Sequence, residues 1–291
     1  MAYAFKRDDA TVEEAVRRIA GELVEETLAT LADDSRPLGT RIHEARKAVK
    51  KLRGLIRLVR SQFPDSRAEL AALRTAAESV AALRDNDVLC TVFDRIARRA
   101  ALPPQEKAAL RAPFQAALDA ARSPEALQTA TTAFSAAFEK LATRIAGWRL
   151  TRGGFPALDP GLRRTWSEAR TALKEAAGHT DPEAIHTLRK RVKDHWYQAR
   201  LLAPIWPEMM GPHVTAADRL GEMLGDIHDL DVLAAGLADT GGPGAQHVID
   251  AVQAEKGRLQ ATALPLARRL LAGGADDLAD RWRKCWKVWR A

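Results

Sequence analysis

The chain has 291 residues, of which 46% are hydrophobic and 29% charged, with a net charge of +7. This composition is typical of a folded globular protein, and the length suits one large domain or two ordinary ones. Two cysteines imply no disulfide, and no apolar run is long enough for a membrane-spanning helix, so we expect a cytoplasmic protein. Ala and Leu dominate without β-type alternation, which predicts an all-α fold.

The first part of the chain predicts a series of amphipathic helices. The first runs over residues 11–31 with Thr11 as its N-cap, and the second over residues 40–62, ending before Pro64. A third runs over residues 66–83, breaks near "RDND" and resumes to residue 99. Two more follow, one opened by "LPPQEKAAL" and one capped by Ser123.

A segment rich in Gly and Pro, "TRGGFPALDPG" (151–161), interrupts the helical pattern and predicts a joint between two halves. We therefore divide the chain into residues 1–150 and 151–291. The second half predicts a helix at "GLRRTWSEARTALKEAA", one capped by Asp181, one at "GEMLGDIHDLDVLAAGL", a long one to residue 271 and a last one to residue 290.

The two halves repeat each other in sequence. Seven residues recur at an offset of 143, and "RDNDVL" (84–89) matches "HDLDVL" (228–233) at an offset of 144. The seven are Ile42, His43, Arg46, Lys47, Val49, Lys50 and Arg57, which match Ile185, His186, Arg189, Lys190, Val192, Lys193 and Arg200. The repeat predicts an internal duplication, with each half a bundle of about four helices and the two bundles related by pseudo-symmetry.

Positive charge is concentrated in the repeated helices. Residues 41–60 contain eight Lys or Arg and one acid, and residues 186–200 contain five Lys or Arg and one acid. On a helical wheel, six side chains of the first helix fall within an arc of about 100°, and six occupy the matching arc of the second. The first row comprises His43, Arg46, Lys50, Arg53, Arg57 and Arg60, and the second row comprises His186, Arg189, Lys193, Trp196, Tyr197 and Arg200.

A solvated helix face is the ordinary explanation of such charge, but it fits these rows poorly. Like charges four residues apart cost about 0.2–0.5 kcal/mol per pair, and a face selected only for solubility would mix both signs. A polyanionic ligand explains the rows better. They lack the Asn and Gln that read bases, and only Trp196 and Tyr197 could stack on them, so the pattern favours phosphate groups without bases.

The spacing of His43, Arg46, Lys50 and Arg53 resembles the conserved-histidine α-helical domain (CHAD) family. "IHTLRKRVKDHWYQARLLAPIWP", "LRRTWSEAR" and "LGDIHDLDVL" resemble it also, and the resemblance covers nearly the whole chain. It implies two pseudo-symmetric four-helix bundles around a basic channel that binds inorganic polyphosphate. This chain departs from the family at Trp196, where an Arg is common, and at His195, where an apolar residue is usual.

We therefore expect a non-catalytic module, without cofactor or metal, that binds inorganic polyphosphate and brings itself or partner proteins to polyphosphate granules in the cytoplasm. The alternatives are a nucleic-acid-binding protein that uses the same rows and a Mg²⁺-dependent phosphohydrolase. The expected polyphosphate-binding residues are His43, Arg46, Lys50, Arg53, Arg57, Arg163, Arg170, His186, Arg189, Lys193, Tyr197 and Arg200.

Three other features have simpler explanations. The sequence around the aspartates lacks the glycine that a calcium-binding loop requires at its sixth position. We therefore expect Asp85, Asp87, Asp229 and Asp231 to cap a helix or orient an arginine. The histidines among the cations are expected to donate to phosphate as neutral groups and gain a proton when the anion binds. The tryptophans of "RWRKCWKVWR" (281–290) predict a closing bundle helix, with a membrane-surface helix as the alternative.

Overall fold

The computed structural model describes residues 3–178 and 181–291, apart from the side chains of Leu83, Arg84 and Pro243. These residues form eleven α-helices and two short 3₁₀ helices and contain no strand, which confirms the predicted all-α class. Across the same residues, no helix is both long and apolar enough to cross a membrane.

The first six helices are α1 (Val12–Ala32), α2 (Leu38–Val59), α3 (Ser66–Ser79), α4 (Ala81–Arg99), α5 (Pro104–Ala121) and α6 (Pro124–Ile145). The predicted N-caps are confirmed at both ends of this series. The Thr11 hydroxyl accepts a hydrogen bond from the Glu14 amide (3.1 Å), and the Ser123 hydroxyl accepts one from the Ala126 amide (3.3 Å). Each hydroxyl satisfies an amide that has no partner inside its helix.

The remaining elements are η1 (Phe155–Ala157), α7 (Asp159–Gly178), α8 (Pro182–Leu202), η2 (Ala203–Ile205), α9 (Pro207–Thr240), α10 (Pro243–Leu270) and α11 (Ala275–Arg290). Asp181 caps α8 as predicted, because its carboxylate accepts a hydrogen bond from the Glu183 amide (3.2 Å).

Two predicted boundaries are wrong. The break between α3 and α4 falls at Val80 and not at "RDND", which lies inside α4. The helix predicted to begin at Gly221 begins at Pro207 instead and continues for 34 residues. Gly221 lies inside α9, where its missing side chain makes room for Lys193. A Cβ at Gly221 would lie 2.7 Å from the Lys193 Cε.

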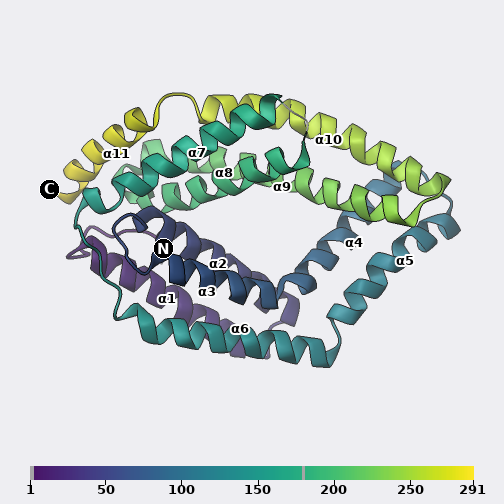
Figure 1. The fold of residues 1–291 in the computed structure, drawn as a ribbon, viewed down its shortest axis with the longest axis horizontal. Coiled ribbons are helices and arrows are strands. Elements are labelled where there is room, and N and C mark those ends of the chain that lie inside the picture. Colours follow the sequence, from purple (N-terminus) through teal and green to yellow (C-terminus); the bar gives the residue numbers. More distant parts are fainter. Residues whose placement is uncertain (1–2, 179–180) are drawn as a thin grey trace.

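Two hydrophobic cores hold the helices together, and each contains helices from both sides of residue 150. The first combines α1, α2, α3 and α6 with Leu201 and Leu202 of α8 and with α11. The second combines α7–α10 with α4 and α5, including Phe93 and Phe114. Figure 1 shows the α4–α5 hairpin lying beside α9 and α10. The division at residue 150 stays a prediction. Each hydrophobic core contains helices from both sides of that residue.

The closing helix α11 supplies tryptophans to the first core, as predicted. Trp282 and Trp286 are buried, and Trp289 packs against them with its ring centre 5.2 Å from that of Trp286. The prediction of a bundle helix with core tryptophans is thus confirmed.

The departure from the family pattern at His195 also has a structural explanation. His195 is fully buried, its Nε2 lies 2.7 Å from the Nε2 of His213, and both rings pack between Trp166 and Trp282. Burial and the neighbouring His213 hold the pKa of His195 well below its ordinary value. The two histidines therefore form a neutral hydrogen-bonded pair that fills the space between α7, α8, α9 and α11.

The helix α2 packs closely on both α7 and α8 through glycines. A Cβ at Gly161 of α7 would lie 1.9 Å from the Leu58 carbonyl oxygen, and one at Gly54 of α2 would lie 2.6 Å from the Tyr197 Cβ. No side chain larger than hydrogen fits at either contact. These glycines therefore set how closely the helix of the first row approaches the helix of the second.

Replacing Gly161 with Ala should force α7 away from α2 and lower the free energy of unfolding by about 1–3 kcal/mol, the usual cost of overpacking. Gly21→Ala is the matched control, because a Cβ at that helical position meets nothing within 4 Å. The control should be neutral or stabilise the protein by up to about 1 kcal/mol. Denaturant titration measures both, and equal stability of the two variants would contradict the close crossing.

Candidate basic anion site

The first row lies along α2 beside a fully buried apolar stripe, as the periodicity predicts. Ile42, Val49, Leu52, Ile56 and Val59 face the core and are at most 4% exposed. On the adjoining face His43 and Lys50 are exposed, whereas Arg46, Arg53 and Arg57 are half-buried. The apolar stripe fixes the rotation of α2 and so fixes the direction in which the basic side chains extend.

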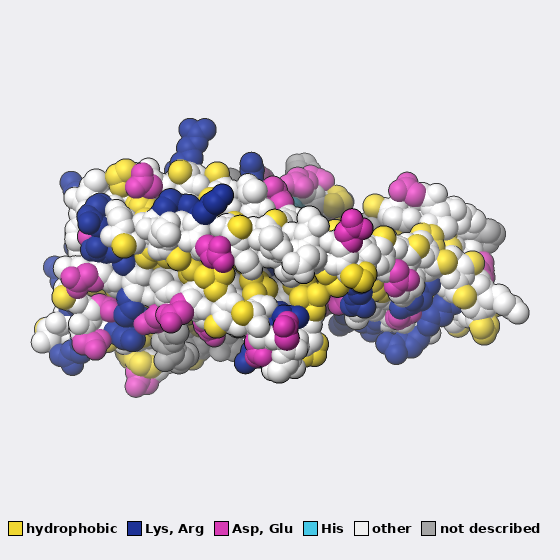
Figure 2. All heavy atoms as spheres, turned by 90° about the horizontal axis from the view of Figure 1, so that it is seen from below, with side chains coloured by type: hydrophobic (Ala, Val, Ile, Leu, Met, Phe, Trp, Pro, Cys, Tyr) yellow, Lys and Arg dark blue, Asp and Glu magenta, His cyan; other side chains and the backbone are white. Residues whose placement is uncertain are grey.

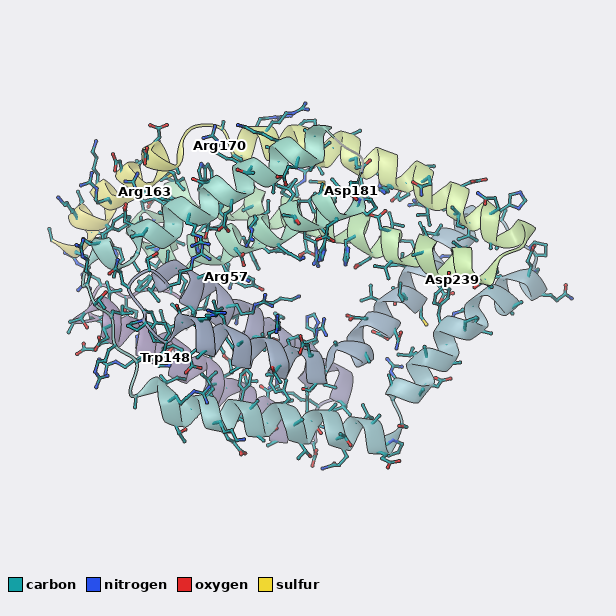
Figure 3. All side chains as sticks on the ribbon, in the orientation of Figure 1. Arg57, Trp148, Arg163, Arg170, Asp181 and Asp239 are labelled. Atoms are coloured by element: carbon teal, nitrogen blue, oxygen red, sulfur yellow. The ribbon has the colours of Figure 1, made fainter. Side chains whose placement is uncertain are left out.

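The C-terminal end of the first row is used to join the two halves of the chain. Arg57 forms an ion pair with Asp194 of α8, and Arg60 lies 3.2 Å from Glu168 of α7. Arg191 of α8 contacts both carboxylates, at 3.5 Å from Asp194 and 3.3 Å from Glu168. Figure 3 shows Arg57 in the region between α2 and the helices of the second half.

Asp194 is only 6% exposed, so its charge depends on these arginines. Burial raises the pKa of Asp194 above its ordinary value, and the charges of Arg57, Arg191 and Arg53 act in the opposite direction. Removing an arginine would leave a buried carboxylate without compensation, which is costly. Arg57 is therefore a structural partner of Asp194 in this structure.

Arg53 lies next to this network but takes no carboxylate of its own. Among the described residues, none forms a hydrogen bond or ion pair with its guanidinium. Burial and the adjacent Arg57 lower its pKa, yet a guanidinium stays charged throughout the physiological range. Arg53 thus presents a half-buried positive charge that an anion can pair with.

Arg46 is held at the break between α3 and α4. Its guanidinium donates to the carbonyl oxygens of Val80 (3.3 Å) and Ala81 (3.4 Å) and lies 3.2 Å from Asp85. The helix break places these two carbonyl oxygens, at the start of α4, within reach of the guanidinium. The expectation that Asp85 orients an arginine is confirmed.

Two other carboxylates of the repeated "D-x-D" motif also pair with cations. Asp87 lies 2.7 Å from Arg122, and Asp231 pairs with Lys256 of α10. Within residues 3–178 and 181–291, no group of three or more His, Cys, Asp or Glu side chains could hold a metal ion.

A pocket of about 540 Å³ lies at the N-terminal end of the first row. His43 and Thr40 line it together with Asp87 and Arg122. Sequence reasoning missed Arg122, because it follows the end of α5, far from both rows in the chain, and belongs to no repeated motif. The fold brings its charge beside His43.

The second row lies along α8 and packs against two glycines of α9. A Cβ at Gly221 would collide with the Lys193 side chain, and one at Gly225 would lie 3.2 Å from the Arg189 Nε. That Nε is buried and has no hydrogen-bond partner in the described part of the chain. The glycines, four residues apart on one face of α9, let the stems of both basic side chains lie across the helix.

Trp196 lies between two cations of the second row. The Lys193 ammonium is 4.4 Å and the Arg200 guanidinium 4.9 Å from the centre of its ring. Arg200 is also 5.5 Å from the ring of Tyr3. These cation–π contacts hold Lys193 and Arg200 in place without neutralising them.

His186 stacks on His228 of α9, with ring centres 4.1 Å apart. Burial, the neighbouring His228 and the charge of Lys190 lower the pKa of His186 to about 4. Burial also lowers the pKa of His228. Both imidazoles are neutral at pH 7, and the Nδ1 of His186 is buried without a hydrogen-bond partner. Sequence reasoning missed His228, although it stands in the repeated motif "HDLDVL".

Three predicted site residues lie apart from this arrangement. Arg163 contacts Asp159 (2.8 Å), Asp280 (2.7 Å) and Asp276, which ties α7 to α11. Figure 3 shows Arg163 and Arg170 on the side of α7 that lies toward α10 and α11. Tyr197 is buried against Gly54 and stacks edge-on against Tyr3, and burial raises its pKa.

The two rows lie next to each other where α2 packs on α8. The charges of Arg57 and Arg53 act to lower the pKa of Asp194 on α8. The charges of Lys193, Arg189 and Lys50 act to lower the pKa of Glu222 on α9. Cations from both halves therefore act to lower the pKa of the same carboxylates. The face shown in Figure 2 differs, because basic and acidic side chains are interspersed over it.

Comparison with known proteins identifies the fold and the family of the chain. No curated protein matches the chain. Among solved structures, the CHAD domain from the plant Ricinus communis matches with a TM-score of 0.64 at 20% identity, over 94% of this chain and 96% of that one. The fold of the two is thus the same. The sequence matches the CHAD domain family over residues 10–238, most of its length. The chain therefore belongs to the CHAD domain family, as its paired histidine and arginine motifs indicate.

Proposed function

We propose that the protein binds inorganic polyphosphate between the two basic rows. The observation that carries this proposal is the packing of α2 on α8, which brings the two rows together and places Arg57 and Arg191 against one carboxylate, Asp194. Adjacent rows of guanidinium, ammonium and imidazole groups match a flexible chain with a charge on every phosphate. The contacts that we propose come from His43, Arg46, Lys50, Arg53, His186, Arg189, Lys193 and Arg200.

We propose that three of the other predicted residues support this site without contacting the ligand. Arg57 neutralises the buried Asp194, Tyr197 spaces α2 from α8, and Arg163 fastens α7 to α11. In these positions they hold the helices that carry the two rows and the helix α7 that packs on both. We also propose that the pseudo-symmetric duplication underlies the site, because it supplies the second row at a constant offset from the first.

Nucleic acid is the second candidate, and the aromatic side chains argue against it. Single-stranded binders stack bases on open aromatic faces. Trp196 is covered by Lys193 and Arg200, and Tyr197 is buried, so neither offers an open face. A phosphate chain needs no stacking surface, which makes polyphosphate the better match.

We propose a binding and targeting role without catalysis. A Mg²⁺-dependent phosphohydrolase would need carboxylates to hold the metal. Asp85, Asp87 and Asp231 instead pair with Arg46, Arg122 and Lys256. In this role the protein would bring itself, and any partner proteins, to polyphosphate granules in the cytoplasm.

Reversing the charge of either central arginine, Arg46→Glu or Arg189→Glu, should weaken binding of long-chain polyphosphate by about 10- to 100-fold. Each change removes a charge-assisted contact of about 1.5–3 kcal/mol and adds repulsion. Calorimetric titration measures the affinity, and circular dichroism checks that helicity is retained. Arg268→Glu is the control, since this exposed residue lies on α10, which packs on α9, α4, α5 and α7. Unchanged affinity in both row variants would remove them from the site.

Binding should also depend on chain length. A long polyphosphate can reach both rows, so its second engagement is intramolecular and benefits from a high effective concentration. Tripolyphosphate can reach only part of one row and should bind far more weakly at equal total phosphate. Cancelling the first row with Arg46→Glu and Lys50→Glu should remove most of this difference. Affinity per site that is independent of length would mean that the rows do not share a ligand.

Affinity should rise as the pH falls from 7 to 5. His186 is neutral in the free protein with a pKa of about 4, and a bound phosphate raises that pKa by favouring the imidazolium. The complex then holds more protons than the free protein, so acid favours binding. Titrations in buffers of different ionisation enthalpy measure this proton uptake. His186→Gln should reduce it, whereas His247→Gln, at an exposed position on α10, should not. Equal uptake in both variants would contradict the linkage.

A further inference from the structure

Two carboxylates of α9 contact one cation of the proposed site. Glu222 of α9 lies 2.5 Å from the Lys193 ammonium, and Asp218, one turn earlier, lies 3.2 Å from the same nitrogen. The Glu222 side chain is 74% exposed, whereas that of Lys193 is only 21% exposed. The cation is thus held by its surroundings, and the carboxylate reaches it from solvent.

The position of Lys193 is fixed independently of Glu222. Its stem lies on Gly221, where a Cβ would approach within 2.7 Å of Cε, and its ammonium lies 4.4 Å from the centre of the Trp196 ring. Loss of the Glu222 carboxylate would therefore leave the ammonium in place. Glu222 has no comparable anchor, because most of its side chain is in solvent.

The surroundings of Glu222 are those expected for a bound anion. Burial raises its pKa, but the hydrogen bond from Lys193 and the charges of Lys193, Arg189 and Lys50 outweigh that effect, so the pKa lies below its ordinary value. These cations come from both rows. The Glu222 carboxylate thus occupies the place where the proposed site would hold a phosphate.

We propose that Glu222 is an internal anion that a phosphate ligand must displace from Lys193, and that this cost keeps short anions, which have few other contacts, weakly bound. This inference rests on the function proposed above. An exposed ion pair is weak, so a ligand with many phosphates displaces the carboxylate at little cost. Every phosphate ligand that reaches Lys193 bears the same cost of displacement. A long chain stays bound through its contacts to neighbouring cations, whereas a short anion has few other contacts.

The test compares Glu222→Gln with Asp226→Asn. Asp226 lies one turn further along α9, its side chain is 45% exposed, and it lies 3.8 Å from Arg95 instead of a row cation. Both variants remove one negative charge from the same helix, so only the position differs. Glu222→Gln should raise the affinity for tripolyphosphate about three- to fivefold, which is the strength of an exposed ion pair. It should raise the affinity for long-chain polyphosphate by a similar factor, because the same ion pair is broken, and Asp226→Asn should change both only slightly.

Calorimetric titration of the full chain with each ligand decides the matter, with the unmodified protein and long-chain polyphosphate measured first. If that titration shows no binding, the proposed function itself is wrong and the internal anion with it. If it shows binding, but Glu222→Gln improves the tripolyphosphate affinity no more than Asp226→Asn does, the internal anion alone is overturned. Weaker binding by Glu222→Gln would overturn it as well.

Discussion

The close approach of α2 to α7 and α8 is the constraint on which the rest of the structure depends. Gly161 and Gly54 allow it sterically, since a Cβ at either position would collide with the opposing helix. The approach brings two rows of cations together, which like charges oppose. Asp194 and Glu168 offset part of that repulsion by taking Arg57, Arg60 and Arg191 into ion pairs. The structure thus uses one end of the first row to hold the other end beside the second row.

Three of the remaining cations are positioned before any ligand arrives. Arg46 is held by carbonyls at the α3–α4 break, Lys193 by Gly221 and Trp196, and Arg189 by Gly225. Such preorganisation lowers the entropy that ordering of long side chains would otherwise cost on binding. Every one of these supports is backbone, glycine or an aromatic face, so it directs a cation with little loss of its charge. Glu222 and Asp85 are carboxylates at the same site, and both have exposed side chains.

Much of the fold could be predicted from the sequence, because local patterns encode it. The apolar stripe of α2, the caps Thr11, Ser123 and Asp181 and the buried tryptophans of α11 all follow from spacing along single helices. The exchange of helices between the cores could not be predicted, because it depends on how distant segments pack. Gly221 was misleading for a related reason: a glycine inside a helix and one at a helix start look alike until the partner helix is known.

The candidate site could likewise be predicted only in part. Both rows follow from periodicity, but Arg122, His228 and Glu222 reach them only through tertiary contacts of α4, α5 and α9. Conversely, the pattern could not separate Arg53, which has no carboxylate partner in the described structure, from Arg57, whose charge is taken by a buried Asp194 on another helix. Charge on a helix face can be read from sequence, whereas its neutralisation by a distant residue cannot.

The central claim is that the paired rows recognise a phosphate chain and not nucleic acid. The most direct measurement is a competition in which labelled long-chain polyphosphate is displaced by single-stranded RNA, duplex DNA or unlabelled polyphosphate, at equal phosphate concentration and equal salt. The account predicts that unlabelled polyphosphate displaces the label at far lower concentration than either nucleic acid. Equal or better displacement by RNA or DNA would contradict it, because the rows would then serve as a general nucleic-acid surface.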